Sequence, residues 1–367
     1  MTPWKRTLTG LLGAGTFATT AGAETHLSMT ALDQRISALE AKAPVNPPSG
    51  GIDLEFYGYV KADLIYNFGY DLGLTTFSLG SLTEASETGD FFDATARQTR
   101  LGVRSNMETA IGEVGLQVEG DFYGEGGTLR LRHATATLGP WRVGKYWTTF
   151  MPLASYPVTL DFQGIAGIPF ARPDQVRYTH AFGGTYTAEV AIEQSVADSD
   201  DPVLIGTLAY QTDPVLLKIA ALTGNVNDGT GGTVDSYGLN LSSTLTFGAT
   251  TIDASYTMGE AINSYMVFPG DDIDATGAAV ETRTAYVSVA QSVTDKLTLR
   301  AMYGWHENDS GATADSTERL TTVHVNASYD ILENTSVGIE YFHGTRDTFG
   351  GSAIDVDRVQ AAVTYTF

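Results

Sequence analysis

Apolar and polar residues alternate with a period of two along most of this chain, from about residue 52 to its last residue. In residues 54–67, Leu54 and Phe56 fall on one face, and Glu55 and Lys61 fall on the other. The same alternation recurs in residues 112–123, 128–138, 296–307 and 355–367. A period of two is typical of β-strands whose two faces meet different environments. The pattern therefore predicts an all-β fold from residue 52 to residue 367.

The connectors between these segments alternate between short and long. Short turns fall near residues 106–111, 139–141, 182–185, 212–214, 247–250, 293–296 and 330–335. Longer polar connectors fall near 68–95, 150–172, 197–202, 224–235, 260–281, 307–318 and 346–355, with a tight turn at 124–127. A soluble sandwich also alternates, but it does not keep all its short turns at one end, as outer-membrane barrels do. Only a closed barrel satisfies every strand backbone group in lipid. We therefore predict a 16-stranded antiparallel transmembrane β-barrel.

The first 23 residues have the three parts of a secretory signal peptide. Lys5 and Arg6 form the positive region, residues 8–18 form a short apolar stretch, and small residues at 21–23 form a cleavage site. The apolar stretch is too short to span a hydrocarbon layer about 30 Å thick. We therefore predict that residues 1–23 are a signal peptide and that the chain is exported.

A short helix is predicted at residues 24–43, where apolar residues repeat as in a coiled coil. The residues of this stripe are Met29, Leu32, Ile36 and Leu39. Prolines and glycines in residues 44–51 end the helix and form a linker to the barrel. Because two heptads are marginal in water, two interpretations remain. The segment is either a frayed leader or a periplasmic coiled coil that forms when the chains assemble.

Aromatic residues gather near the expected strand ends, as they do in the girdles at membrane interfaces. These residues are Phe122, Trp147, Tyr303 and Trp305 near the long connectors, and Tyr329 and Tyr365 near the short turns. The last residue, Phe367, shares a face with Tyr365 and resembles the C-terminal targeting signal of bacterial outer-membrane proteins. Both features predict a place in the bacterial outer membrane.

The formal net charge is −22, with 43 acidic and 21 basic residues and no cysteine. This charge argues against a nucleic-acid partner, because phosphate binding needs a basic surface. About half of the acidic residues fall in the long connectors, where they either keep mobile loops soluble or bridge divalent cations to anionic lipid such as lipopolysaccharide. The absence of cysteine excludes disulfides and thiolate metal sites. No pattern for a cofactor or a resident metal is present.

Several arginines fall on the polar face of their predicted strands. A charge that faces lipid costs a few kcal/mol near the membrane midplane, so we expect these side chains to line the pore. The predicted pore-lining residues are Arg100, Arg104, Arg130, Arg132, Arg142, Arg177 and Arg300, together with the acidic Asp121 and Glu119. Around the turn at 124–127, however, antiparallel pairing places Asp121 near Arg130 and Glu119 near Arg132. These pairs either stabilise the sheet alone or leave part of a basic wall free to attract anions.

The connector at residues 150–172 is unusually apolar for a loop in water. We expect it to fold inward and to narrow the lumen, because a barrel of this size leaves an aqueous channel unless something fills it. The residues predicted to shape this constriction loop are Phe150, Asp161, Phe162 and Arg172.

An enzyme on the barrel would need a catalytic group at the membrane rim. The histidines of the barrel are scattered, and neither an HExxH nor a GxSxG pattern is present. His133, His180 and His343 share the apolar parity of their strands, so we expect them near the membrane interfaces. We therefore expect that the chain is not an enzyme and has no catalytic residues.

The chain resembles the DcaP-like porins of Gram-negative bacteria over most of its mature length. The resemblance is strongest in ARQTRLGVRS (96–105), EGDFYG (119–124), LRLRHATATLG (129–139), VGKYWTTFM (143–151), TLDFQGIAG (159–167) and RPDQVRYT (172–179). It implies a homotrimer of 16-stranded barrels that passes small anionic solutes, with dicarboxylates as the name-giving class. It also implies a basic lining from Arg97, Arg100, Arg104, Arg130 and Arg132, although Arg97 shares the parity of the apolar Leu101.

The predicted function is therefore an outer-membrane porin, a passive diffusion channel for small hydrophilic anions. The basic wall and the constriction loop would select the solute, since narrow pores select by diameter and lining charge. Two alternatives remain open, namely a structural or adhesive barrel and a general porin without anion preference.

Overall fold

The structure is a computed structural model that describes residues 53–367. The predicted signal peptide, the helix with Met29, Leu32, Ile36 and Leu39, and the linker at 44–51 lie outside the described residues and stay predictions. None of the helical segments in residues 53–367 is long and apolar enough to cross a membrane.

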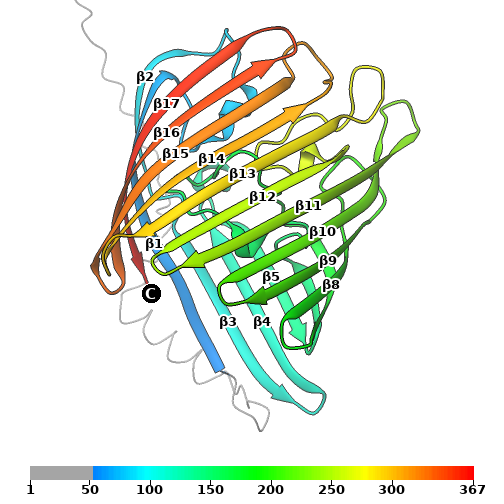
Figure 1. The fold of residues 1–367 in the computed structure, drawn as a ribbon, viewed down its shortest axis with the longest axis vertical. Helices are drawn as coiled ribbons and strands as arrows, with labels where there is room; N and C mark the ends of the chain where they lie inside the picture. The colour runs from blue at the N-terminus through cyan, green and yellow to red at the C-terminus, as the bar shows by residue number, and fades with distance from the viewer. Residues whose placement is uncertain (1–52) are drawn as a thin grey trace, which may run out of the picture. The chain divides into compact units, whose positions relative to one another are not determined.

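The described chain forms one antiparallel sheet (Figure 1). Its strands are β1 (Asp53–Tyr70), β2 (Thr88–Thr95), β3 (Arg100–Thr109), β4 (Gly112–Asp121), β5 (Arg130–Leu138), β6 (Trp141–Lys145), β7 (Asp174–Phe182), β8 (Tyr186–Glu193), β9 (Val203–Thr212), β10 (Val215–Asn227), β11 (Thr233–Phe247), β12 (Thr250–Glu260), β13 (Glu281–Ser292), β14 (Leu297–Asn308), β15 (Thr317–Leu332), β16 (Thr335–Thr348) and β17 (Ala353–Thr366). Four short 3₁₀ helices lie in the connectors: η1 (Thr76–Ser81), η2 (Glu125–Gly127), η3 (Leu153–Ser155) and η4 (Asn263–Tyr265).

The sheet closes because β17 pairs back with β1, from Tyr59 opposite Thr366 to Phe68 opposite Asp357. The segments β2 and β3 both pair with β1, one along its second half and the other along its first. Together they make one barrel strand with a break at residues 96–99. The 17 segments therefore form a closed barrel of 16 strands, as the alternation of connectors predicts.

The two faces of the strands differ as the sequence pattern requires. Large apolar side chains such as Phe56, Leu64 and Ile339 are exposed on the outer face. Polar side chains of the opposite parity, such as Asn240 and Thr284, are buried on the inner face. Burying apolar side chains in lipid is favourable, and the polar ones find partners inside. The outer surface is therefore suited to a membrane.

Three long connectors fold into the lumen and form its core. They span residues 71–87, 146–173 and 261–280. Leu79, Ile168 and Phe268, one from each connector, belong to one buried cluster. The wall contributes inward side chains to the same cluster, namely Tyr286, Met302, Leu320, Phe342, Ile354 and Val356. The predicted constriction loop, residues 150–172, lies within the second of these connectors, which begins four residues earlier and ends one residue later.

Glycines let the constriction loop approach the wall closely. A Cβ on Gly304 of β14 would collide with the backbone of Ala166, and a Cβ on Gly338 of β16 would lie 2.9 Å from the side chain of Leu160. Phe150 is fully buried and packs in the same way against Gly238 of β11. The loop therefore lies flat on the wall from β11 to β16.

A β-bulge between β4 and β5 changes the parity of β5. Glu119 pairs with His133 and Gly120 pairs with Leu131, so Arg132 is an extra residue on its strand. A bulge of this kind puts the next side chain on the other face. His133 therefore faces inward beside Arg132, with 3% of its surface exposed. The prediction that His133 lies at a membrane interface is wrong for this reason.

The prediction for Trp147 is also wrong. Trp147 belongs to the constriction loop and packs edge-on against Phe170 inside the lumen, not in an outer aromatic girdle. Two other histidines fit the prediction better. His180 stacks between Tyr178 and Phe182 beside a short turn, and His343 is half-exposed on the outer face.

Candidate functional site

The constriction loop is fixed to the wall by a buried ion pair. Nη1 of Arg358 on β17 lies 2.9 Å from Oδ1 of Asp161, and both side chains are almost completely buried. Arg358 also donates to the side chain of Asn67 and to the carbonyls of Gly73 and Thr75. The pair therefore joins β17, β1, the 71–87 connector and the constriction loop at one point.

The other end of the loop is held by wall residues of the opposite side. The backbone N–H of Thr149 donates to the carboxylate of Glu193 at 2.7 Å. The ammonium group of Lys218 donates to the carbonyls of Thr149 and Met151, each at 3.1 Å. These contacts satisfy backbone groups that the loop would otherwise bury without partners.

Opposite the anchored loop, three arginines share two carboxylates. Arg130 lies 2.8 Å and Arg132 lies 3.0 Å from Oδ2 of Asp121. Glu119 accepts from Arg132 at 2.8 Å and lies 3.4 Å from Arg100. The two cross-strand pairs predicted from the turn at 124–127 are thus confirmed. Three cations against two anions leave this strip with a surplus of positive charge.

Arg172 adds a guanidinium that has no carboxylate within ion-pair distance among residues 53–367. Its charged group lies over the rings of Trp147 at 5.0 Å and Phe170 at 5.5 Å. Its Nη1 is buried and has no hydrogen-bond partner in the described structure. Burial, followed by the like charges of Arg132 and Arg130, lowers the pKa of Arg172. The arrangement favours an anion beside this group.

The remaining predicted pore residues lie in different surroundings. Arg97 lies in the break between β2 and β3 and packs near Gly127, and Arg104 forms an exposed ion pair with Glu55 at 2.6 Å. Arg142 lies 4.0 Å from the ring of Tyr146 and has no carboxylate partner in residues 53–367. Two further residues have local partners: Arg177 lies 3.4 Å from Glu189, and Arg300 donates to Ser328 at 2.9 Å.

A cavity of about 370 Å³ lies between the basic wall and the infolded loops. Arg130 and Arg172 line it together with aromatic rings, and Phe162 stacks on Tyr123 at 4.3 Å. Burial raises the pKa of Tyr123. The sequence predicts Phe162 and Arg172 here. Tyr123 escaped prediction, because no spacing rule links it to a loop some 40 residues away.

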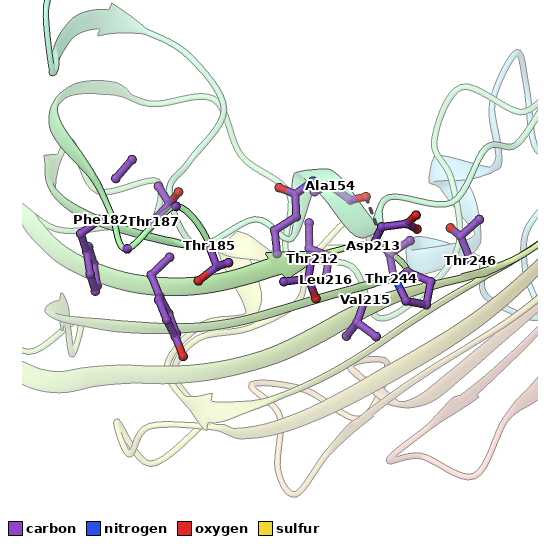
Figure 2. Close-up of a pocket in the computed structure, with 16 residues that line it drawn as sticks. Ala154, Phe182, Thr185, Thr187, Thr212, Asp213, Val215, Leu216, Thr244 and Thr246 are labelled. Carbon is purple, nitrogen blue, oxygen red and sulfur yellow. Dashed lines mark hydrogen bonds between the residues drawn. The ribbon is translucent and has the colours of Figure 1, made fainter.

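A second cavity of about 870 Å³ lies beyond the constriction loop, toward the short turns (Figure 2). Ala154 of the loop lines it, together with residues of the turns that join β7 to β8 and β9 to β10. Most of its polar lining is threonine, at positions 185, 187, 212, 244 and 246. This space is lined by hydroxyl groups and one carboxylate, that of Asp213, and no Lys or Arg of residues 53–367 lines it.

No group of three or more potential metal ligands gathers in residues 53–367. The arrangement offers positive charge and hydrogen-bond donors along a lumen. It therefore provides groups for binding and passing a solute.

A closed, antiparallel 16-stranded barrel with an apolar outer face and an inward-folded loop is the architecture of outer-membrane porins. Residues 37–208 match the family described as DcaP outer membrane protein, which confirms the resemblance found in the sequence. The protein is accordingly located in the bacterial outer membrane. A search of curated proteins finds no match.

Solved structures support the same fold. The outer membrane channel DcaP of Acinetobacter baumannii is 24% identical, with a TM-score of 0.79 over 86% of this chain and 98% of that chain. An anion-selective porin from Comamonas acidovorans is 14% identical, with a TM-score of 0.63 over 86% of this chain and 100% of that chain. The trimer form of OmpT from Vibrio cholerae is 15% identical, with a TM-score of 0.57 over 86% and 100% of the two chains. At these identities the likeness shows the fold alone.

Replacement of Asp161 by Asn tests the buried anchor. The change leaves the Arg358 charge buried without its partner, and we expect it to lower the free energy of unfolding by about 3–5 kcal/mol. Urea unfolding of the barrel in lipid vesicles measures this loss. Glu55→Gln, which breaks the exposed pair with Arg104, is the control and should unfold like the parent. Equal unfolding curves for both variants would contradict a structural role for the buried pair.

Proposed function

We propose that this protein is a porin, a passive diffusion channel for small hydrophilic anions. The observation that carries the proposal is Arg172, which lines the cavity at the constriction beside Arg130 and has no carboxylate within ion-pair distance among residues 53–367. An incoming anion supplies the missing partner at little cost, because the site already holds the charge in place. The anion-selective porin that shares the fold supports this direction.

Dicarboxylates are the solute class that we propose. Arg130 and Arg172 line the same cavity. Arg172 can bind a carboxylate through two parallel hydrogen bonds, and Arg130, whose Nε and Nη2 already donate to Asp121, has its remaining N–H groups for a second one. A solute with two carboxylates can therefore engage both groups at once. The resemblance of the sequence to the DcaP-like porins, which implies dicarboxylates, agrees with this class.

Arg172→Gln tests the anion preference. A hydrogen bond to a charged group contributes about 1.5 kcal/mol or more. The dicarboxylate concentration that blocks half of the current should therefore rise about tenfold. The reversal potential in a salt gradient should also shift toward cations. Single-channel recording in planar bilayers measures both quantities.

The control is Lys296→Gln, which removes the same charge from an exposed turn. It should keep the parent's block and reversal potential. A parent channel that is strongly cation-selective would rule out the anion proposal and leave a general porin. If purified protein gave no current at all, the channel itself would be excluded in favour of a structural barrel.

We propose that the protein assembles as a homotrimer, as the trimer form of OmpT does. The exposed apolar outer face is compatible with burial against neighbouring copies. An unheated sample on a denaturing gel should migrate as a trimer and convert to monomer on heating. A monomer band before heating, with the barrel still folded, would contradict the trimer.

Lipopolysaccharide is the proposed lipid partner. Where the strands meet the long loops, the outer face carries exposed ion pairs, namely Arg283 with Glu281 within β13 and Arg319 of β15 with Glu307 of β14. Acidic residues dominate the adjoining loops, and divalent cations can bridge carboxylates to lipid phosphates. A chelator should therefore reduce the lipopolysaccharide that stays bound to purified protein, measured by native mass spectrometry. Retention of all the lipid in chelator would contradict cation bridging.

A further inference from the structure

Glu340 on β16 is buried at the point where the constriction loop touches the wall, with 1% of its side chain exposed. Its Oε2 accepts the backbone N–H of Leu160 at 2.9 Å, and its Oε1 accepts that of Asp161 at 3.0 Å. Asn326 donates to Oε2 at 2.9 Å, and the Nδ1 of His324 lies 3.2 Å from Oε1. One carboxylate thus holds two consecutive amides of the loop.

The hydrogen-bond geometry indicates that the neighbouring histidine, His324, is neutral. Nε2 of His324 is buried and has no hydrogen-bond partner in the described residues. An imidazolium would bury a charged N–H without a partner, which is more costly than an unpaired lone pair. The proton therefore lies on Nδ1 and is donated to Glu340. All four neighbours of the carboxylate are then donors.

A proton on Glu340 cannot be accommodated without loss of a loop contact. The new O–H would face donors, so one loop amide would lose its acceptor. Asn326 could turn its oxygen toward the proton, but its NH₂ would then give up the carbonyl of Val158, another loop residue, which it now contacts at 3.1 Å. A buried amide left without an acceptor is costly.

Glu340 differs from the other acids of the network in the charged groups that surround it. Asp161 on the loop has Arg358 at 2.9 Å, and Asp63 on β1 has Lys61 at 3.0 Å. Within residues 53–367, no Lys or Arg lies within ion-pair distance of Glu340, whose one such partner is His324. Arg358 and Arg300, on β17 and β14, act on it only from farther away.

We propose that the ionised carboxylate of Glu340 is the positioning group that fixes the reach of the constriction loop into the lumen, and that its protonation releases the loop and makes the channel sensitive to acid. Lys61 donates to the carbonyl of Leu160 at 2.6 Å, so the Leu160–Asp161 segment is held from both sides in the ionised state. Release of the two amides frees the loop segment that lies nearest to the Arg358 anchor. This proposal rests on the proposed channel function, because it concerns the same constriction.

The test is single-channel recording from pH 8 down to pH 3 on the parent, on Glu340→Gln and on the control Glu333→Gln, because a carboxylate surrounded by four donors takes up a proton only in strong acid. The control lies in the exposed turn between β15 and β16 and removes the same charge. We expect the parent to pass through one acid transition, seen as a change in conductance and as current flicker. Glu340→Gln should show the acid behaviour at every pH and lack the transition, because its amide replaces an acceptor by a donor. The control should follow the parent.

A second variant keeps the proposal testable if Glu340→Gln does not assemble. His324→Phe removes one hydrogen bond to the carboxylate and fits beside the ring of Phe342. The midpoint of the acid transition should then move upward by about one pH unit, since one pH unit corresponds to 1.36 kcal/mol. An unmoved midpoint would overturn the proposal.

The proposal is also overturned if the parent has no acid transition, or if Glu340→Gln keeps it. Failure of the anion preference would be distinguishable, because that preference is read from the reversal potential. The reversal potential of Glu340→Gln at pH 8 should keep the sign of the parent's. A parent without any current would remove the channel function itself.

Discussion

The pairing of buried charges in the lumen is the interaction on which the rest of this structure depends. A barrel in lipid must turn its polar faces inward, and here the infolded loops then remove much of that face from water. Asp161 with Arg358, and Glu340 with two loop amides, are possible only because each buried charge has a fixed partner. A charge buried without one is costly. The position of the loop is therefore set by electrostatics and by packing together.

The same rule separates two kinds of arginine. Arg132 is enclosed by Glu119 and Asp121, so it stabilises the bulged wall and has little charge left for a solute. Arg172 is held by aromatic rings, which stabilise a cation without neutralising it. The number of arginines in the lumen therefore overstates the positive charge that is free to attract a solute. At the constriction, the positive charge that a solute meets comes from the surplus of the Arg100, Arg130 and Arg132 strip and from Arg172.

The face of the strand on which each residue lies could be predicted, because it depends only on the local sequence. The alternation gives the 16 strands, the inward arginines and the pairing of Asp121 with Arg130, which lie close in sequence across a tight turn. The alternation fails at His133, because Arg132 is an extra residue in a β-bulge and a bulge leaves no clear signal in a single sequence. The contact of Glu340 with Leu160 joins residues 180 positions apart, and only the folded loop brings them together. Residues in loops, such as Trp147, do not alternate between two faces, so the sequence pattern does not predict where their side chains lie.

The constriction loop packs against one side of the barrel wall, and this asymmetry shapes the channel. Gly304 and Gly338 let it lie flat on β14 and β16, with Glu340 and Arg358 fixing it there. The space that remains is bounded by the loop on one side and by the basic wall of β3, β4 and β5 on the other. Phe162 of the loop lies under the guanidinium of Arg130, 5.6 Å away. The anchors on one wall thereby determine how close a solute must pass to the charges on the other.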